Sequence, residues 1–388
     1  MYLCQCGRKG YVTIMSEMKK EVEYFIHLLA AAINGFEPRA EQGIDYSALL
    51  DLANKHQVYN IIFPIIQNNP DVPNEEKQKF RAYNLSEISR MVFVNQERES
   101  VFNFFNENNI DYMPLKGLVI RNYYPKVSMR QMSDNDVLVD IKYRDVIADY
   151  MKEHGYKVTS TGRQSDDYFK APYSTFEFHR ELFFSENDFC PDFGDLWAKA
   201  TKDEEHPNMY HMDAEDVYIY SVSHMYKHFT SSGCGVRFLA DNYLILKKEQ
   251  DNLDWDYVNN MFEQNGILEF EQKTRKLAFA IFDQTQLDDD DLELLETIIN
   301  FGIFGSGKIR ISNKIHQMAE GSSLEQAKKN YLLSRLFPPK KKMIADNRIL
   351  EKKPYLLPWY YVKRLFKAIF NSKKTLGELK TVTKTDID

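Results

Sequence analysis

The chain has 388 residues, of which 43% are hydrophobic and 28% charged, so it can bury a full core and disorder is excluded as its dominant state. Its net charge of −7, from 50 basic and 57 acidic residues, argues against a general nucleic-acid binder that works by neutralising phosphates. Four cysteines in a chain of this length do not make a disulfide framework, which favours a reducing, cytoplasmic compartment.

The first 110 residues are predicted to be mostly helical. Residues 1–17 show no helical or strand period and are expected to form a disordered extension, and no run in the chain approaches the about 20 apolar residues of a membrane span. From residue 18 to 110, apolar side chains recur at steps of three and four, which indicates helices with one apolar face. In the long helix expected after Asn74, the positions predicted to face the core are Phe80, Tyr83, Ile88, Val92, Val101 and Phe105.

A small mixed sheet is predicted for residues 111–185, where short apolar runs replace the helical pattern. The candidate strands are 111–115, 137–139, 156–160 and 175–182, with a helix over 143–155. The last strand alternates, with Phe176 and Phe178 pointing one way and Thr175, Glu177 and His179 the other. The expected fold class is therefore mixed α/β, with this sheet as a core flanked by N- and C-terminal helical domains.

Helices return after the sheet and are predicted to form a domain over residues 186–334, before a basic tail with one helix at 335–388. Between residues 335 and 374 the tail carries 12 Lys and Arg against Asp346 and Glu351. Its helix interleaves Trp359 and Tyr360 with Lys363, a pattern typical either of a C-terminal helix packed against the body or of weak contact with an anionic membrane surface.

The most informative segment for chemistry contains Asp134 and Asp136, two residues apart at the start of a strand. Alternation along a strand places both carboxylates on one face, and two anions held so close require a cation between them. The cation expected to bind there is a hard divalent ion, Mg²⁺ or Mn²⁺. Glu177, on the polar side of its strand, is the candidate third carboxylate, and Asp140 is the first alternative to it.

Phosphate-binding groups are expected around this pair. Gly117 follows a strand and precedes a helical stretch, so backbone N–H groups there can approach a triphosphate closely. Arg130 supplies a cation next to the aspartates. Arg237 and Asp241, four residues apart on a predicted helix, are expected to form an ion pair.

A second helical segment carries His224 and His228, four residues apart, with Lys227 between them. These side chains are interpreted either as a polar stripe that faces the cleft or as core histidines with satisfied hydrogen bonds. A zinc site is the less favoured alternative, because two histidines alone do not complete one.

Several separate blocks resemble the bacterial uncharacterised nucleotidyltransferase family, within the superfamily that has the DNA polymerase β-like catalytic core. These blocks are PLKG at 114–117, Arg130, SDND at 133–136, FEFH at 176–179, SHMYKHF at 223–229, VRFLADNYLIL at 236–246 and the C-terminal LFPPKKKM. The resemblance covers about residues 20 to 370. Two departures are the 16 residues between Gly117 and Asp134, a longer spacing than is usual, and Asn135, which stands where an aliphatic residue is usual.

The resemblance implies a Mg²⁺- or Mn²⁺-dependent nucleotidyltransferase in which Asp134, Asp136 and Glu177 are catalytic and hold the metal. An NTP, with ATP expected, would give its nucleoside monophosphate to a hydroxyl of an unidentified small molecule, glycan or protein. The residues expected to contact the nucleotide are Lys116, Gly117, Arg130, Ser133, His224, Lys227 and His228. The alternative is a catalytically inactive relative, with Asn135 as its sign, that binds nucleotide or a protein partner and contacts membranes peripherally. No sequence-specific nucleic-acid partner is expected.

Overall fold

The structure is a computed structural model that describes residues 12–183, 189–231 and 233–303, and beyond these residues 311, 315, 318, 323–340, 343–344, 347, 349–370 and 382. The chain forms two compact units, which are described separately. The larger unit contains residues 21–227 and 235–303, and the smaller contains residues 1–20, 228–234 and 304–388. Cys4 and Cys6 lie outside the described residues.

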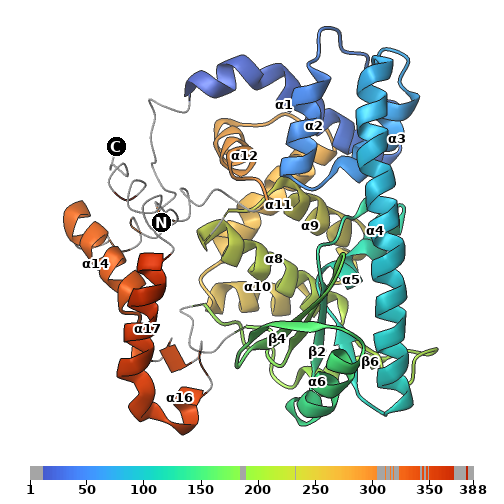
Figure 1. The fold of residues 1–388 in the computed structure, drawn as a ribbon. Coiled ribbons are helices and arrows are strands. Elements are labelled where there is room, and N and C mark those ends of the chain that lie inside the picture. The colour runs from blue at the N-terminus through green and yellow to red at the C-terminus, as the bar shows by residue number, and fades with distance from the viewer. Residues whose placement is uncertain are drawn as a thin grey trace. The chain divides into compact units, whose positions relative to one another are not determined.

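The larger unit contains a five-stranded mixed sheet with the strand order β1-β2-β5-β4-β3 (Figure 1). The strands are β1 (Tyr112–Pro114), β2 (Asn135–Val139), β3 (Lys157–Thr161), β4 (Ser165–Lys170) and β5 (Ser174–His179). Strand β2 runs parallel to β5, and the other three pairings are antiparallel. A mixed sheet flanked by helices is the fold class that the sequence predicts, and the prediction is confirmed.

Strand β4 is absent from the sequence prediction. Its sequence is SDDYFK, and aspartate is depleted in strands. Both aspartates are accommodated by polar partners, because Asp166 is bonded to two arginines and Asp167 accepts a hydrogen bond from Ser165 Oγ at 2.9 Å. The two arginines that bind Asp166, Arg144 and Arg180, lie outside β4, so the local pattern does not reveal them.

One face of the sheet is apolar and packs on two helices, α4 (Asn74–Glu107) and α6 (Arg144–Glu153). The buried residues that form this core include Val101, Phe105, Val137, Ile147, Met151, Tyr168, Phe176 and Phe178. Because side chains alternate along a strand, Asp136 and Glu177 belong to the opposite face. Figure 1 shows α6 on one side of the sheet and α8 on the other.

Most of the remaining helices lie wholly or mainly in the larger unit. They are α1 (Val12–Asn34), α2 (Tyr46–Lys55), α3 (Tyr59–Asn68), α5 (Gly117–Ile120), α7 (Leu196–Lys199), α8 (Ala214–Ser231), α9 (Val236–Glu249), α10 (Trp255–Gln264), α11 (Leu268–Phe282) and α12 (Asp289–Phe301). Short elements are η1 (Arg121–Tyr123), η2 (Val127–Met129), η3 (Ile141–Tyr143), β6 (Thr201–Lys202) and β7 (Tyr210–His211). Helix α1 begins inside the segment 1–17 that was expected to be disordered, and residues 1–11 lie outside the described part.

The buried face of α4 differs from the prediction. Its buried residues are Phe80, Glu87, Val94, Arg98, Val101 and Phe105. Tyr83, Ile88 and Val92, which the hydrophobic pattern assigned to the core, are exposed. Glu87 is instead bonded to Arg90 and Tyr59, and Arg98 to Asn135. A pattern read from apolar residues alone cannot identify a face that is held by buried polar contacts.

The smaller unit contains α14 (Leu324–Leu336), α16 (Ile349–Lys352), η4 (Pro354–Leu356) and α17 (Leu357–Phe370). Tyr361 Oη donates to the Pro338 carbonyl at 2.6 Å, and Arg364 Nε donates to the Arg335 carbonyl at 3.0 Å, so α17 is fastened to the end of α14. Trp359 is exposed. Among the residues described, no helix is long and apolar enough to cross a membrane.

Candidate active site

Asp136 and Glu177 lie side by side on the polar face of the sheet. The parallel register of β2 and β5 pairs Asp136 with Glu177 and Leu138 with His179. His179 Nε2 lies 2.7 Å from Asp136 Oδ1 and 3.5 Å from Glu177 Oε2. Over the described ranges, these three residues are the group of potential metal ligands whose donor atoms all lie within 4.8 Å of one another. The sequence analysis did not select His179, although the alternation that points to Glu177 places it on the same face.

Lys116 brings a positive charge into this cluster. Its Nζ lies 2.7 Å from Asp136 Oδ1, and the turn that carries it is tied to β2 by a hydrogen bond from Leu115 N–H to the Asp136 carbonyl at 2.9 Å. The Lys116 backbone has a φ of 50°, a conformation uncommon outside glycine. The tight turn between β1 and α5 therefore points this side chain at the carboxylate of β2.

The charge of Asp136 is stabilised from two sides. Burial by itself raises the pKa of this carboxyl group, but the Lys116 ammonium and the hydrogen bond from His179 outweigh it and hold the pKa well below its ordinary value. The same contact with Asp136 raises the pKa of Lys116 against the effect of burial. Both groups are therefore charged at neutral pH.

Asp134 lies just before β2 and is half-buried, with Ser133 Oγ donating to its Oδ1 at 3.3 Å. Its pKa is raised to about 6, first by burial and then by the negative charge of Asp136, with Glu177 adding to the effect and Lys116 and Arg237 opposing it. The three predicted carboxylates thus share one electrostatic site. A bound cation would relieve their repulsion.

Helix α8 borders the same face through Tyr220 and Lys227. Burial raises the pKa of Tyr220, which Lys116 opposes and Asp136 and Glu177 reinforce. The pKa of Lys227 is lowered, first by burial and then by the like charge of Lys116, while Glu177 and Asp136 act in the opposite sense. Lys227 therefore interacts electrostatically with Lys116, Glu177 and Asp136.

The two histidines of α8 are placed differently. The His224 ring lies 6.2 Å from the Tyr220 ring and 5.7 Å from the Phe238 ring, centroid to centroid. His228 falls in the smaller unit, so the structure does not place it relative to the site.

Arg130, predicted as a cation beside the two aspartates, forms an ion pair with Asp241. Its Nε and Nη2 donate to the two carboxylate oxygens of Asp241 on α9 at 3.0 and 2.7 Å, and Tyr124 Oη donates to the same carboxylate at 2.8 Å. All of these side chains are buried. The expected ion pair between Arg237 and Asp241 is replaced by this one.

The close packing of Arg130 also explains the glycine at position 117. A Cβ added to Gly117 would lie 2.6 Å from Arg130 Nη1 and 3.1 Å from Met132 Cγ. A separation under 3 Å is far inside ordinary van der Waals contact, so any larger residue would displace the arginine. The glycine thus has a packing role at the start of α5.

Asn135, the departure from the usual family pattern, is fully buried and hydrogen-bonded. Its Oδ1 accepts from Arg98 Nη1 at 3.3 Å, and its Nδ2 donates to the Thr175 carbonyl at 3.1 Å. The polar side chain therefore links α4 to β2 and β5, and it does not leave an unsatisfied group in the core.

One further carboxylate, Asp167, extends the acidic row. The register of β4 and β5 pairs Asp167 with Glu177, so Asp136, Glu177 and Asp167 follow one another across three strands. Burial and the charge of Glu177 contribute to a raised pKa of Asp167. The sequence analysis missed this residue because it did not predict β4.

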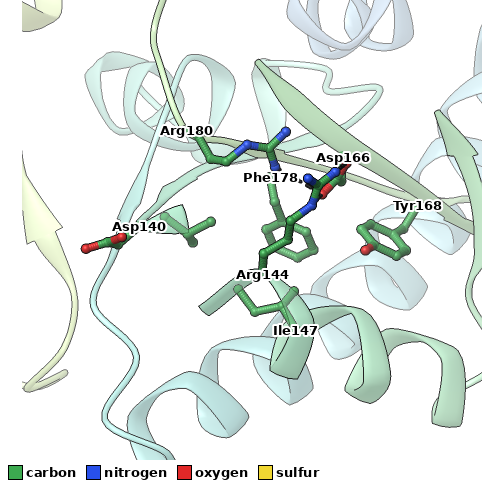
Figure 2. A pocket seen from close by; sticks show the side chains of 8 residues that line it. Asp140, Arg144, Ile147, Asp166, Tyr168, Phe178 and Arg180 are labelled. Carbon is green, nitrogen blue, oxygen red and sulfur yellow. Dashed lines mark hydrogen bonds and ion pairs between the residues drawn. The ribbon is translucent and has the colours of Figure 1, made fainter. Parts of the chain in front are cut away.

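Asp140, the alternative third ligand, has another role. Its side chain accepts from Lys142 N–H at 2.9 Å at the start of η3. It also lines a small hollow on the apolar side of the sheet, together with Arg144, Asp166 and Arg180 (Figure 2).

Figure 2 shows Arg144 and Arg180 converging on Asp166 in this hollow. Arg144 donates to both Asp166 oxygens, and Arg180 Nη1 donates to Oδ2 at 3.0 Å. The other two Arg180 nitrogens donate to the backbone carbonyls of Arg163 and Gly162. The polar atoms of Arg180 are therefore committed within the protein, as in a structural ion-pair cluster.

The family comparison covers all the elements that build the polar face. A model for the family described as uncharacterised nucleotidyltransferases matches residues 42–283, which is more than half of the chain and includes the whole sheet, α8 and α9. Comparison with curated proteins and with solved structures gives no match. The family match, together with a carboxylate cluster on adjacent parallel strands, shows that the chain belongs to the uncharacterised nucleotidyltransferase family.

Proposed function

We propose that the protein is a divalent-metal-dependent nucleotidyltransferase, which moves a nucleoside monophosphate from an NTP to a hydroxyl group of an acceptor. The observation that carries the proposal is the register pairing of Asp136 with Glu177, with Asp134 two residues earlier in the same electrostatic site. Family membership supplies the reaction class, and this cluster supplies the residues that could perform it.

The donor atoms of the cluster fit a hard divalent cation. Asp136 and Glu177 offer carboxylate oxygens on adjacent strands, and His179 contacts both. Asp134 lies outside this group of three but interacts with both carboxylates electrostatically. Mg²⁺ or Mn²⁺ is the proposed ion. When bound, such an ion neutralises charge on the transferring phosphate and on the leaving pyrophosphate.

In the proposed reaction the acceptor oxygen attacks the α-phosphorus in line, the new P–O bond forms, and the bond to the bridging oxygen breaks to release pyrophosphate. Glu177 is the best placed proton acceptor, because its side chain is 30% exposed whereas that of Asp136 is 3% exposed. Lys116 and Lys227 supply positive charge beside the carboxylates for phosphate oxygens. ATP is the donor that we propose, and the acceptor is a small molecule, glycan or protein.

The proposal is tested by pyrophosphate release from labelled NTPs with Mg²⁺ or Mn²⁺, in the presence of cell extract as a source of acceptor. We expect Asp136→Asn to abolish release. We expect Glu177→Gln to keep nucleotide binding but slow transfer by about 10²–10⁴-fold, the usual cost of losing a general base. Asp140→Asn is the matched control, because Asp140 follows β2 but caps η3. Full turnover in Asp136→Asn, or no turnover by the wild type with any NTP, would reject the proposal.

A second candidate is a protein that binds nucleotide without transferring it. Its support is that Lys116 and His179 both contact the same Asp136 oxygen, so this carboxylate already has cationic and hydrogen-bonding partners. Nucleotide binding that persists without pyrophosphate release under every metal and acceptor condition would favour this candidate.

A further inference from the structure

Arg237, on α9, is a buried guanidinium that lacks a carboxylate partner among the described residues. It is 8% exposed. Asp241, one turn further along α9, is engaged through both oxygens by Arg130 and also by Tyr124. Arg237 Nη1 donates to two neutral oxygens, Gln57 Oε1 and the Gln131 carbonyl, the latter at 3.3 Å. Its Nε is buried without a hydrogen-bond partner.

A charge in this situation is costly to the folded protein. Burial, followed by the like charge of Arg130, lowers the pKa of Arg237 to about 10, although Asp241 and Tyr124 act in the opposite sense. Buried charges are ordinarily paired with an opposite charge, because removing an ion from water is expensive. The environment of Arg237 thus has the properties of an anion site.

Arg237 is connected to the segment that carries the proposed active-site carboxylates. Gln131, whose carbonyl accepts from Arg237, lies three residues before Asp134 in the segment that leads into β2. Arg237 and Asp134 also interact electrostatically, each favouring the charged form of the other. Lys116 and Lys227 flank the carboxylates at Asp136 and Glu177, so Arg237 provides a separate cation near Asp134.

The Asp166 cluster also contains two arginines and one aspartate, but its contacts are those of a structural ion-pair cluster. In that cluster both arginines bind the same aspartate, and Arg180 directs all three of its nitrogens to the aspartate or to backbone carbonyls. Arg180 is less buried than Arg237 as a whole residue, although only 8% of its side chain is exposed. Arg180 and Arg237 differ in whether the protein provides acceptors for all three of their nitrogen atoms.

We propose that Arg237 binds a phosphate group of the nucleoside triphosphate, with the Arg130–Asp241 pair holding Asp241 away from it. The proposal rests on the proposed function in one respect, because the nucleotide supplies the phosphate. The guanidinium can direct the N–H donors of Nη2, which has no hydrogen-bond partner among the described residues, to phosphate oxygens in a charge-assisted manner.

The test is calorimetric titration of the full-length protein with inorganic tripolyphosphate and, separately, with ATP, at low ionic strength and with EDTA present. These conditions remove any contribution from metal or turnover. We expect Arg237→Gln to weaken both ligands by about 10- to 100-fold, the range of charge-assisted hydrogen bonds. Arg237→Lys, which keeps the charge but not the fork, should bind with intermediate affinity. Arg180→Gln should bind like the wild type.

Melting temperatures distinguish a binding role from a structural one. We expect Arg237→Gln to melt no lower than the wild type, because it removes an unpaired buried charge, and Arg180→Gln to melt several degrees lower. Unchanged affinity in Arg237→Gln, no tripolyphosphate binding by the wild type, or weakened binding of tripolyphosphate but not of ATP would overturn the proposal. Failure of the proposed function would instead appear as intact tripolyphosphate binding without any metal-dependent release of pyrophosphate.

Discussion

Asp134 and Asp136 are two residues apart, yet the protein treats their charges differently. Asp136 touches Lys116 and His179, which together lower its pKa. Asp134 has Ser133 as its hydrogen-bond donor, and burial and the neighbouring anions raise its pKa to about 6. The protein therefore stabilises the charged form of Asp136. The charged form of Asp134 is disfavoured by the fold, and an additional cation would stabilise it.

This difference predicts opposite effects of the two isosteric substitutions on the metal-free protein. In EDTA at neutral pH, Asp134→Asn should raise the free energy of unfolding by about 1–3 kcal/mol, because it removes a carboxylate whose ionisation the fold disfavours. Asp136→Asn should lower it by up to about 3–5 kcal/mol, because Lys116 loses its buried anionic partner. Urea unfolding measures both changes.

The pH dependence of the first effect has a definite sign. A raised pKa in the folded state means that this contribution to stability is present below the unfolded pKa and is lost as the pH rises through about 6. The advantage of Asp134→Asn over the wild type should therefore disappear below about pH 4. A variant that is less stable than the wild type at pH 7 would contradict the site description.

At the scale of elements, Asn135 links α4 to the sheet through its hydrogen bonds to Arg98 and to the Thr175 carbonyl. We predict that Asn135→Val, which installs the usual aliphatic residue, destabilises the protein by about 1–3 kcal/mol, because the buried Arg98 guanidinium loses an acceptor. The double variant Arg98→Met/Asn135→Val should recover part of this loss. Chemical denaturation of the three variants measures the coupling, and a more stable Asn135→Val single variant would refute it.

A hydrogen bond between His56 and Val236 links the end of α2 to the start of α9, the helix that carries Arg237 and Asp241. His56 caps the C-terminus of α2, and its Nδ1 accepts from Val236 N–H at 3.2 Å. A Cβ added to Gly235 would lie 2.8 Å from His56 Nδ1, so the glycine permits the close approach. An imidazole that accepts at Nδ1 must be neutral at that nitrogen.

The contact made by His56 predicts that the free energy of unfolding falls at acidic pH. Burial, followed by the nearby charge of Lys55, lowers the pKa of His56 to about 3. A lowered pKa in the folded state contributes stability above the unfolded value near 6.5, and this stability is lost as the pH falls. Between pH 6.5 and 5 the loss from His56 should be about 2 kcal/mol.

The measurement is the free energy of unfolding at pH 7 and pH 5 for the wild type, for His56→Gln, and for His154→Gln as an exposed control. His56→Gln should be less stable at pH 7 but should lose less on acidification, whereas His154→Gln should follow the wild type. Equal acid sensitivity of the wild type and His56→Gln would rule out this role.

At the scale of the whole molecule, the proposed site is assembled from segments that are far apart in sequence. Lys116, Asp136, Glu177, Lys227 and Arg237 come from the turn after β1, from β2, from β5, from α8 and from α9. All five belong to the larger unit and to the span that matches the family model. The basic tail belongs to the smaller unit.

The sequence by itself determined what is encoded over short distances. Helical periodicity predicted α2, and strand alternation placed Glu177 and His179 on one face. These features depend on neighbours within a few residues, which is why the mixed α/β class and the paired aspartates could be predicted.

Only the tertiary structure decided which distant residues meet. The parallel register puts Glu177 beside Asp136, and the turn at Lys116 brings an ammonium group to the same carboxylate. The sequence predicted Arg130 as a cation beside Asp134 and Asp136, and Asp241 as the partner of Arg237. Packing instead pairs Arg130 with Asp241, and among the described residues Arg237 has no carboxylate partner. The physical reason is that two arginines are equivalent in sequence, and only the position of their backbones determines which of them reaches the carboxylate.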